Sequence, residues 1–260
     1  MKHLLFAMLL GCSGHGSGAA PAPIDPSVVE AADAADQETG REDASADAVA
    51  PRVLVFDGNS ITAGWSAGYP FCAVRQEAGT IWGCHALGFP YLVARDLGAT
   101  WSSQDNGLGG ASTPQITASA LSRTDPLYDP SGADVAVLNE GTNDYRSGCV
   151  SSACLVGHFT DYVAARHLVG WRVVLLTLTP STVFEAASGV AVAAYTETNA
   201  AIRAGDTRAD AVADVAADPV CGAWGAQRST TYYADGIHPV ALCHARFASI
   251  VLAAIKEIAR

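Results

Sequence analysis

Three residues in this sequence have the types and local settings that nucleophilic catalysis requires. Ser60 follows the apolar run 52–56 through the turn sequence DGN, and Asp235 precedes His238 by three residues in the segment ADGIHP. A serine hydroxyl becomes an effective nucleophile when a base takes its proton, and histidine suits this task because its ordinary pKa is about 6.5. A carboxylate then fixes the imidazole tautomer and stabilises its charged form. The sequence therefore predicts Ser60 as nucleophile, His238 as base and Asp235 as orienting acid.

Each of these residues also has a purely structural explanation. Gly58 permits a sharp turn at the end of a strand, and Ser60 would cap a following helix by accepting a backbone N–H bond. His238 would then be a histidine with satisfied hydrogen bonds, and Asp235 a turn former or helix cap. The positions of the remaining polar segments decide between the two interpretations.

An oxyanion that forms on a substrate carbonyl needs hydrogen-bond donors. Asn143 carries a side-chain amide just after the apolar segment 133–141, and Gly110 offers a backbone N–H that no side chain obstructs. We expect a helix to begin at Ser60, so that its own N–H is a third donor and the helix dipole favours negative charge. Asn143 can also be explained as a residue that hydrogen-bonds its own loop. The predicted oxyanion hole consists of Ser60, Gly110 and Asn143.

The elements that must position these residues alternate along the chain. We expect strands at 52–56, 100–106, 133–141, 171–180 and 209–217, and helices at 88–99, 112–123, 155–170, 189–205 and 239–260. Such alternation is typical of an α/β domain with a mostly parallel sheet covered on both faces. Functional sites in these sheets form at the carboxyl ends of the strands. The segments DGNS, NGLGGAST, NEGTNDY and ADGIHP all follow strands, so we expect them to meet at one edge. This convergence favours the catalytic interpretation.

At this point the sequence resembles the SGNH/GDSL hydrolase family. The family's Gly-Asp-Ser block corresponds to residues 58–60, its glycine block to 107–113, its Gly-x-Asn-Asp block to 141–144 and its Asp-x-x-His block to 235–238. The resemblance spans about residues 52 to 259. It implies a three-layer α/β/α sandwich with a five-stranded parallel sheet in the order 2-1-3-4-5. It also implies ester hydrolysis through an acyl-enzyme, with no metal and no organic cofactor.

The sequence departs from the family pattern at one position. The aspartate that precedes the family's serine is Asn59 here, which has nearly the same shape but no charge and can donate hydrogen bonds. Asp57 is a candidate source of negative charge nearby. The glycine block also leaves its register open between Gly109 and Gly110.

The first 12 residues have a basic start and a short apolar run that ends at Cys12, the pattern of an export signal. The run resembles a bacterial lipobox, so we expect Cys12 to be lipidated and the protein to be exported and anchored at the cell envelope. Leu10 is unusual in a lipobox, which leaves cleavage by an ordinary signal peptidase and secretion as the alternative. Residues 13–50 are acidic and rich in alanine, and we expect a disordered tether. Residues 51–260 then form the hydrolase domain.

Export also fits the cysteines. Without Cys12, six remain, and sequence proximity favours three disulfides in an oxidising compartment. The predicted pairs are Cys72–Cys84, Cys149–Cys154 and Cys221–Cys243. Free buried thiols are the alternative. No Cys-x-x-Cys pair indicates a zinc site.

The net charge of −11 argues against a nucleic-acid partner, because phosphate contacts need a basic surface. We expect a monomer. Asp144 is expected to structure its loop, and His158, His167 and His244 to pack or face solvent.

Substrate is indicated only by aromatic residues near the predicted site. These are Trp65, Tyr69, Phe71, Trp82, Trp224, Tyr232 and Tyr233. Aromatic faces suit sugars and acyl chains alike. We favour short acyl groups, such as acetyl, on carbohydrate. Lysophospholipase, lipase and thioesterase activities are alternatives, as is a non-catalytic surface binding protein.

Overall fold

The computed structural model describes residues 51–67, 75–77, 80–82, 84–185 and 189–260. The predicted signal segment, Cys12 and the tether lie outside the described residues. Five parallel strands form the central sheet in the order β4-β1-β5-β6-β7, which is 2-1-3-4-5 in chain order and confirms the predicted topology. Their bounds are β1 Arg52–Gly58, β4 Trp101–Asp105, β5 Val135–Asn139, β6 Arg172–Leu176 and β7 Ala211–Ala213.

The inner strands are apolar on both faces, because helices cover each side of the sheet. Along β1, Leu54 and Phe56 face one layer, while Val55 between them faces the other. β6 alternates in the same way, with Val174 in the first layer and Val173 in the second. This burial on both faces is typical of parallel sheets.

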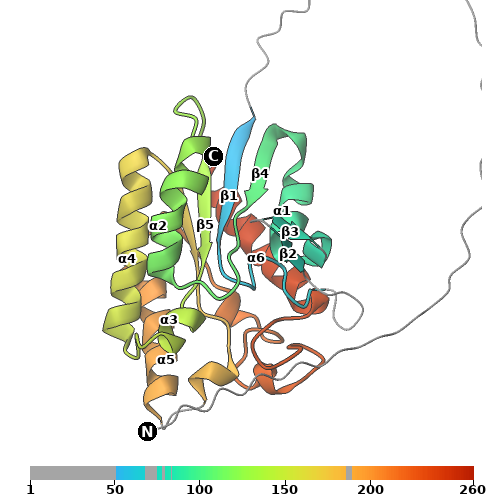
Figure 1. The fold of residues 1–260 in the computed structure, drawn as a ribbon, viewed down its shortest axis with the longest axis vertical. Helices are drawn as coiled ribbons and strands as arrows, with labels where there is room; N and C mark the ends of the chain where they lie inside the picture. Colours follow the sequence, from blue (N-terminus) through green and yellow to red (C-terminus); the bar gives the residue numbers. More distant parts are fainter. Residues whose placement is uncertain (1–50, 68–74, 78–79, 83, 186–188) are drawn as a thin grey trace, which may run out of the picture. The chain divides into compact units, whose positions relative to one another are not determined.

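The helices form two layers (Figure 1). α1 (Phe89–Leu97) and α6 (Ala241–Ile258) cover one face. The other is covered by α4 (Ser152–Val169) and α5 (Val190–Ala204), with α2 (Thr113–Arg123) beside α4. The three-layer α/β/α architecture is therefore confirmed. No helix in the described part of the chain is both long and apolar enough to cross a bilayer.

All ten predicted elements are present, although β7 has only three residues where nine were expected. Three short elements were not predicted. β2 (Arg75–Glu77) and β3 (Thr80–Trp82) form an antiparallel hairpin, and α3 (Thr142–Arg146) follows β5 directly.

Two of the predicted disulfides are present. Cys149 is joined to Cys154 at the start of α4, and Cys221 is joined to Cys243 on α6. Cys72 lies outside the described residues, so its pairing with Cys84 stays a prediction.

Candidate active site

Ser60, His238 and Asp235 lie in one hydrogen-bonded row, although Ser60 is far from the other two in the sequence. Ser60 Oγ is 2.8 Å from His238 Nε2, and His238 Nδ1 is 2.7 Å from Asp235 Oδ2. Nucleophilic catalysis requires this order, with the base between the hydroxyl and a carboxylate. The row is partly open to solvent, since the side chain of Asp235 is 50% exposed and that of His238 14% exposed.

The loop that carries His238 is held by Asp235 itself. Asp235 Oδ1 accepts hydrogen bonds from the backbone N–H groups of Ile237 at 3.0 Å and His238 at 2.9 Å. Burial acts to raise the pKa of Asp235, but the hydrogen bonds from His238 and Ile237 outweigh it and hold the pKa below its ordinary value. The carboxylate is therefore charged at neutral pH, as an orienting acid must be. Gly236 has φ +82° and packs so closely on Thr182 that a Cβ would lie 2.5 Å from Thr182 Cγ2.

Ser60 lies in a tight turn at the carboxyl end of β1. The turn is closed by the hydrogen bond from Ala63 N to Asn59 O at 3.0 Å, and Asn59 Oδ1 accepts from Ile61 N at 2.8 Å. Residues 60–67 form turns rather than the expected helix, so that prediction was wrong. The backbone hydrogen bonds here do not share the uniform spacing of an α-helix, in which each N–H binds the carbonyl four residues earlier. Trp65 N, for example, donates to Ser60 O and Gly64 N to Ile61 O. The Ser60 N–H has no partner within the described residues, but no helix dipole supports it.

Gly58 makes this turn possible. Its φ is +153°, and a Cβ there would lie 2.2 Å from Thr62 Oγ1 and 2.6 Å from Asn139 O. Only glycine fits such a space, because real side chains do not approach backbone atoms so closely.

The predicted oxyanion donors Gly110 and Asn143 belong to neighbouring segments. The loop after β4 is fixed to β1 by the bond from Leu108 N to Gly58 O at 2.7 Å, and Gly110 within it has φ +79°. Asn143 Nδ2 donates to Ala111 O at 2.9 Å, which ties the start of α3 to the glycine loop. An amide nitrogen has two hydrogens, so one remains for a ligand. The N–H of Gly110 has no partner in the described part of the chain.

Asp57 does not serve the site. Its carboxylate is buried and accepts hydrogen bonds from Thr124 Oγ1 at 2.7 Å and Tyr162 OH at 2.7 Å. Burial raises its pKa above the ordinary value, although both hydrogen bonds act to lower it. Asp57 therefore supports the packing of α2 and α4 on the sheet.

The sequence did not single out Glu140. This residue directly follows β5 and is buried, and its Oε2 accepts a hydrogen bond from Asn59 Nδ2 at 3.1 Å. The available signal was an acidic residue directly after the buried segment VAVLN.

Asp144 structures its loop, as expected. One carboxylate oxygen accepts from Thr113 N at 2.8 Å and from the Thr113 hydroxyl at 3.0 Å. The other oxygen lies 2.6 Å from His158 Nδ1, so His158 is neither core packing nor free in solvent, contrary to expectation. The Asp144–Thr113 contact is a second tie between α3 and the segment that follows the glycine loop.

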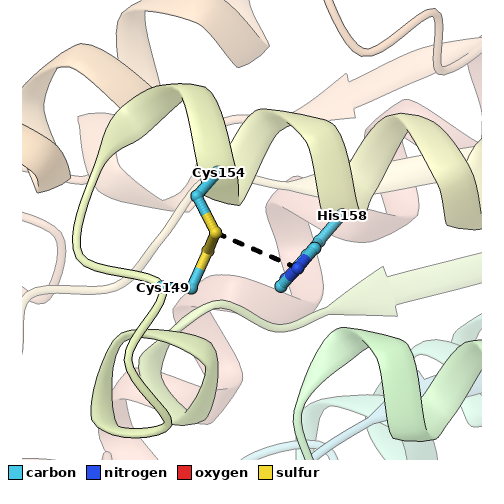
Figure 2. Close-up of side chains that lie close together, drawn as sticks. All are labelled: Cys149, Cys154 and His158. Carbon is cyan, nitrogen blue, oxygen red and sulfur yellow. Dashed lines mark hydrogen bonds between the residues drawn. A yellow bond between two sulfur atoms is a disulfide. The ribbon is translucent and has the colours of Figure 1, made fainter.

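Figure 2 shows His158 pointing toward the disulfide, with Nε2 3.9 Å from Cys154 Sγ. The ligand atoms of Cys149, Cys154 and His158 all lie within 4.8 Å of one another, as metal ligands do. The two sulfurs are bonded to each other, however, and thiolates are the form of cysteine that binds metal.

His167 and His244 are not part of the hydrogen-bonded row. His167 pairs with Asp210 on the surface at 2.8 Å. His244 is fully buried, accepts from Phe89 N at 3.2 Å and stacks on the Phe89 ring. Burial lowers the pKa of His244 to about 3, so it is neutral.

Two of the predicted aromatic residues are exposed in the described part of the chain. Trp65 is 41% exposed, and its ring lies 5.7 Å from that of His238. Trp224 is 40% exposed and contacts Tyr195. Tyr233 was expected near a cleft mouth but is buried, and its hydroxyl donates to Cys221 O. Tyr232 packs partly against the core. Tyr69, Phe71 and the side chain of Trp82 lie outside the described residues.

The fold and the geometry at the carboxyl edge of the sheet define an α/β protein with a serine, a histidine and an aspartate in hydrogen-bonding order. The sequence pattern of the GDSL-like lipase/acylhydrolase family matches residues 56–246. The chain therefore belongs to this family, and the resemblance to SGNH/GDSL hydrolases is confirmed. No match was found among curated proteins.

Solved structures share the fold at low sequence identity. TesA is 20% identical, with a TM-score of 0.55, over 80% of this chain and 99% of that chain. The M. smegmatis aryl esterase is 14% identical, with a TM-score of 0.59, over 80% of this chain and 100% of that chain. A lipolytic G-D-S-L family protein from Veillonella parvula is 14% identical, with a TM-score of 0.57, over 80% of this chain and 99% of that chain. At these identities the likeness establishes the fold alone.

Proposed function

We propose that this protein is a serine esterase that hydrolyses carboxylic esters through an acyl-enzyme. The observation that carries the proposal is the 2.8 Å contact between Ser60 Oγ and His238 Nε2, with Asp235 bound to the other ring nitrogen. Membership of an acylhydrolase family agrees with it.

In the first half of the proposed reaction, His238 Nε2 takes the proton of Ser60 while Oγ forms a bond to the ester carbonyl carbon. Asp235 holds Nδ1 protonated and stabilises the imidazolium. The C–O bond to the alcohol then breaks, and His238 returns the proton to the leaving oxygen. The product at this stage is an ester between Ser60 and the acyl group.

In the second half, water replaces the alcohol. His238 takes a proton from the water as its oxygen attacks the acyl carbon, and Ser60 leaves with that proton. The carboxylic acid is released and the hydroxyl is restored. Microscopic reversibility makes the same residues serve both halves.

The carbonyl oxygen carries negative charge in both tetrahedral states. The proposed donors are the backbone N–H groups of Ser60 and Gly110 and the second amide hydrogen of Asn143. None of the three has another partner within the described residues, which supports this assignment. One such donor contributes about 3 kcal/mol of transition-state stabilisation.

For the substrate, we infer short acyl esters on carbohydrate. The support is the exposed Trp65 ring beside His238, a flat aromatic face on which a sugar ring can stack. The same face suits an acyl chain, so the substrate series must separate the two. Rates with p-nitrophenyl esters of increasing chain length test the acyl part, and acetylated oligosaccharides test the sugar part. We expect the highest kcat/KM with acetate or propionate. An optimum beyond about eight carbons would favour a lipase or thioesterase instead, as long chains bury more apolar area.

Whether the protein is an enzyme at all is tested by a fluorophosphonate probe, which reacts with activated serines. We expect labelling of the native protein and none of Ser60→Ala. A folded native protein that resists the probe would favour the alternative of a non-catalytic surface binding protein.

We also propose that the protein acts at the bacterial cell envelope, held by a lipid on Cys12. The support is the short apolar run that ends at this cysteine. Cys12→Ser should move the protein from the membrane fraction to the soluble fraction. If native and variant proteins fractionate alike, secretion without an anchor is the better description.

A further inference from the structure

Asn59, the residue that departs from the family pattern, contacts a carboxyl group. Its Nδ2 donates to Glu140 Oε2 at 3.1 Å, while its Oδ1 accepts from Ile61 N at 2.8 Å. The first bond crosses from the end of β1 to the end of β5. The second lies inside the turn that carries Ser60. Asn59 thus joins Glu140 to the backbone of the nucleophile turn.

Glu140 lies in a setting that disfavours its charge. The residue is 3% exposed, Oε2 also accepts from Gly141 N at 3.2 Å, and Oε1 has no partner in the described part of the chain. No cation contacts the carboxyl group there. The charged group that acts on it is Asp144, which repels a second negative charge and is itself paired with His158. Burial and then Asp144 raise the pKa of Glu140 well above its ordinary value.

We propose that Glu140 is a positioning residue for Ser60, acting through Asn59, and that its presence requires asparagine rather than aspartate at position 59. This inference rests on the proposed function, because it assigns Glu140 and Asn59 to holding the nucleophile turn. Asparagine donates to Glu140 Oε2 whether the carboxyl group is neutral or ionised. The turn therefore keeps its geometry in both protonation states.

Aspartate at position 59 would respond differently. One oxygen would still accept from Ile61 N, but the other would replace the amide nitrogen that now lies 3.1 Å from Glu140 Oε2. Two carboxyl groups at this separation share one proton, and the second ionisation of the pair is strongly opposed. The pair would hold together while it kept that proton and would repel once the proton was lost.

The sign of the pH effect follows from this. In Asn59→Asp, the bridge between the two strands is present at low pH and lost as pH rises through the raised pKa of the pair. The kcat/KM should therefore fall on the alkaline side relative to the native protein. Glu140→Gln in the same chain should remove the effect, because the glutamine amide donates to the introduced aspartate carboxylate at any pH.

The experiment compares four proteins: native, Asn59→Asp, Glu140→Gln and the double variant. The kcat/KM for p-nitrophenyl acetate is measured from pH 5 to pH 9, and thermal denaturation midpoints are measured over the same range. Glu197→Gln on the exposed face of α5 is the matched control for loss of a carboxylate.

At the alkaline end of the range, we expect the kcat/KM of Asn59→Asp, relative to that of the native protein, to be about tenfold or more lower than at the acidic end. In the double variant, kcat/KM at the alkaline end should return to within about threefold of the native value, because the effects of the two substitutions are coupled. Glu197→Gln should keep the native kcat/KM and pH profile. Glu140→Gln alone should keep the shape of the native pH profile, because the glutamine amide oxygen still accepts from Asn59. A native-like profile for Asn59→Asp, or a double variant no better than Asn59→Asp, would overturn the proposal.

Two further outcomes are also decisive. If Asn59→Asp folds only at acidic pH, or only together with Glu140→Gln, the denaturation midpoints support the same coupling. If it fails to fold in every condition and combination, the coupling is refuted. The midpoints need no substrate, so they test the Asn59–Glu140 pair even if the native protein proves to have no esterase activity.

Discussion

The side-chain amide of Asn143 donates to the Ala111 carbonyl oxygen at 2.9 Å. This bond fixes the amide group next to the glycine loop, with one hydrogen left over. Because Ala111 directly follows Gly110, the same contact holds two of the three proposed oxyanion donors in one place. The rigidity of the donors matters, since preorganised dipoles need no rearrangement when charge develops.

Replacement of Asn143 by alanine should therefore reduce kcat far more than it changes KM. We expect a loss of about 10²–10³-fold in kcat, the usual effect of removing one oxyanion donor. Steady-state kinetics with p-nitrophenyl acetate measure both constants. The denaturation midpoint of the variant shows whether the lost bond to Ala111 has also loosened the loop. An unchanged kcat would remove Asn143 from the oxyanion hole.

Changes at His238 and Asp235 should differ in severity. His238→Ala removes the proposed base and should lower kcat about 10⁶-fold, while Asp235→Ala should lower kcat about 10⁴-fold because the imidazole is still present. The comparison uses kcat for the same ester with each variant. His167→Ala is the control, as its partner Asp210 lies in a surface pair. Native turnover in His238→Ala would reject the assignment of the base.

His244 should make the protein sensitive to acid. Its pKa is about 3 in the folded state, because of burial, and about 6.5 when unfolded. Between these values the unfolded chain binds more protons, so the free energy of unfolding falls as pH drops from about 6.5 toward 3. His244→Asn should flatten this acid-side loss, on the order of a few kcal/mol. Urea unfolding of both proteins at pH 7 and pH 4 measures the difference, and equal pH slopes would contradict it.

The two disulfides should differ in their contribution to stability. Cys221 and Cys243 are 22 residues apart, and Cys149 and Cys154 are 5 apart. Loop-closure entropy then gives about 3 kcal/mol for the longer link and about 2 kcal/mol for the shorter. Replacement of both cysteines of one pair by alanine, followed by urea unfolding, tests this order. Replacement of Cys221 and Cys243 should lower the free energy of unfolding further, because both side chains are fully buried.

The inner strands of the sheet could be predicted because they are short apolar runs separated by helical segments. Residues 135–139 show this clearly, since a strand covered on both faces has no polar alternation. The turn that carries Ser60 was harder to predict. Both a helix and an irregular turn begin with a capping residue, and only the packing of Gly58 against Thr62 and Asn139 decides which forms.

Sequence alone determined the strand order through family resemblance, the residues of the Ser60–His238–Asp235 row and the glycine positions that the turns need. These depend on residue type and local spacing, which are visible in a linear chain. Only the tertiary structure decided the partners of the buried carboxyl groups: Asp57 with Tyr162, Asp144 with His158, and Glu140 with Asn59. The partners of each pair are 105, 14 and 81 residues apart. The energy of a buried charge depends on what folding brings within about 3 Å of it, and sequence spacing does not specify that distance.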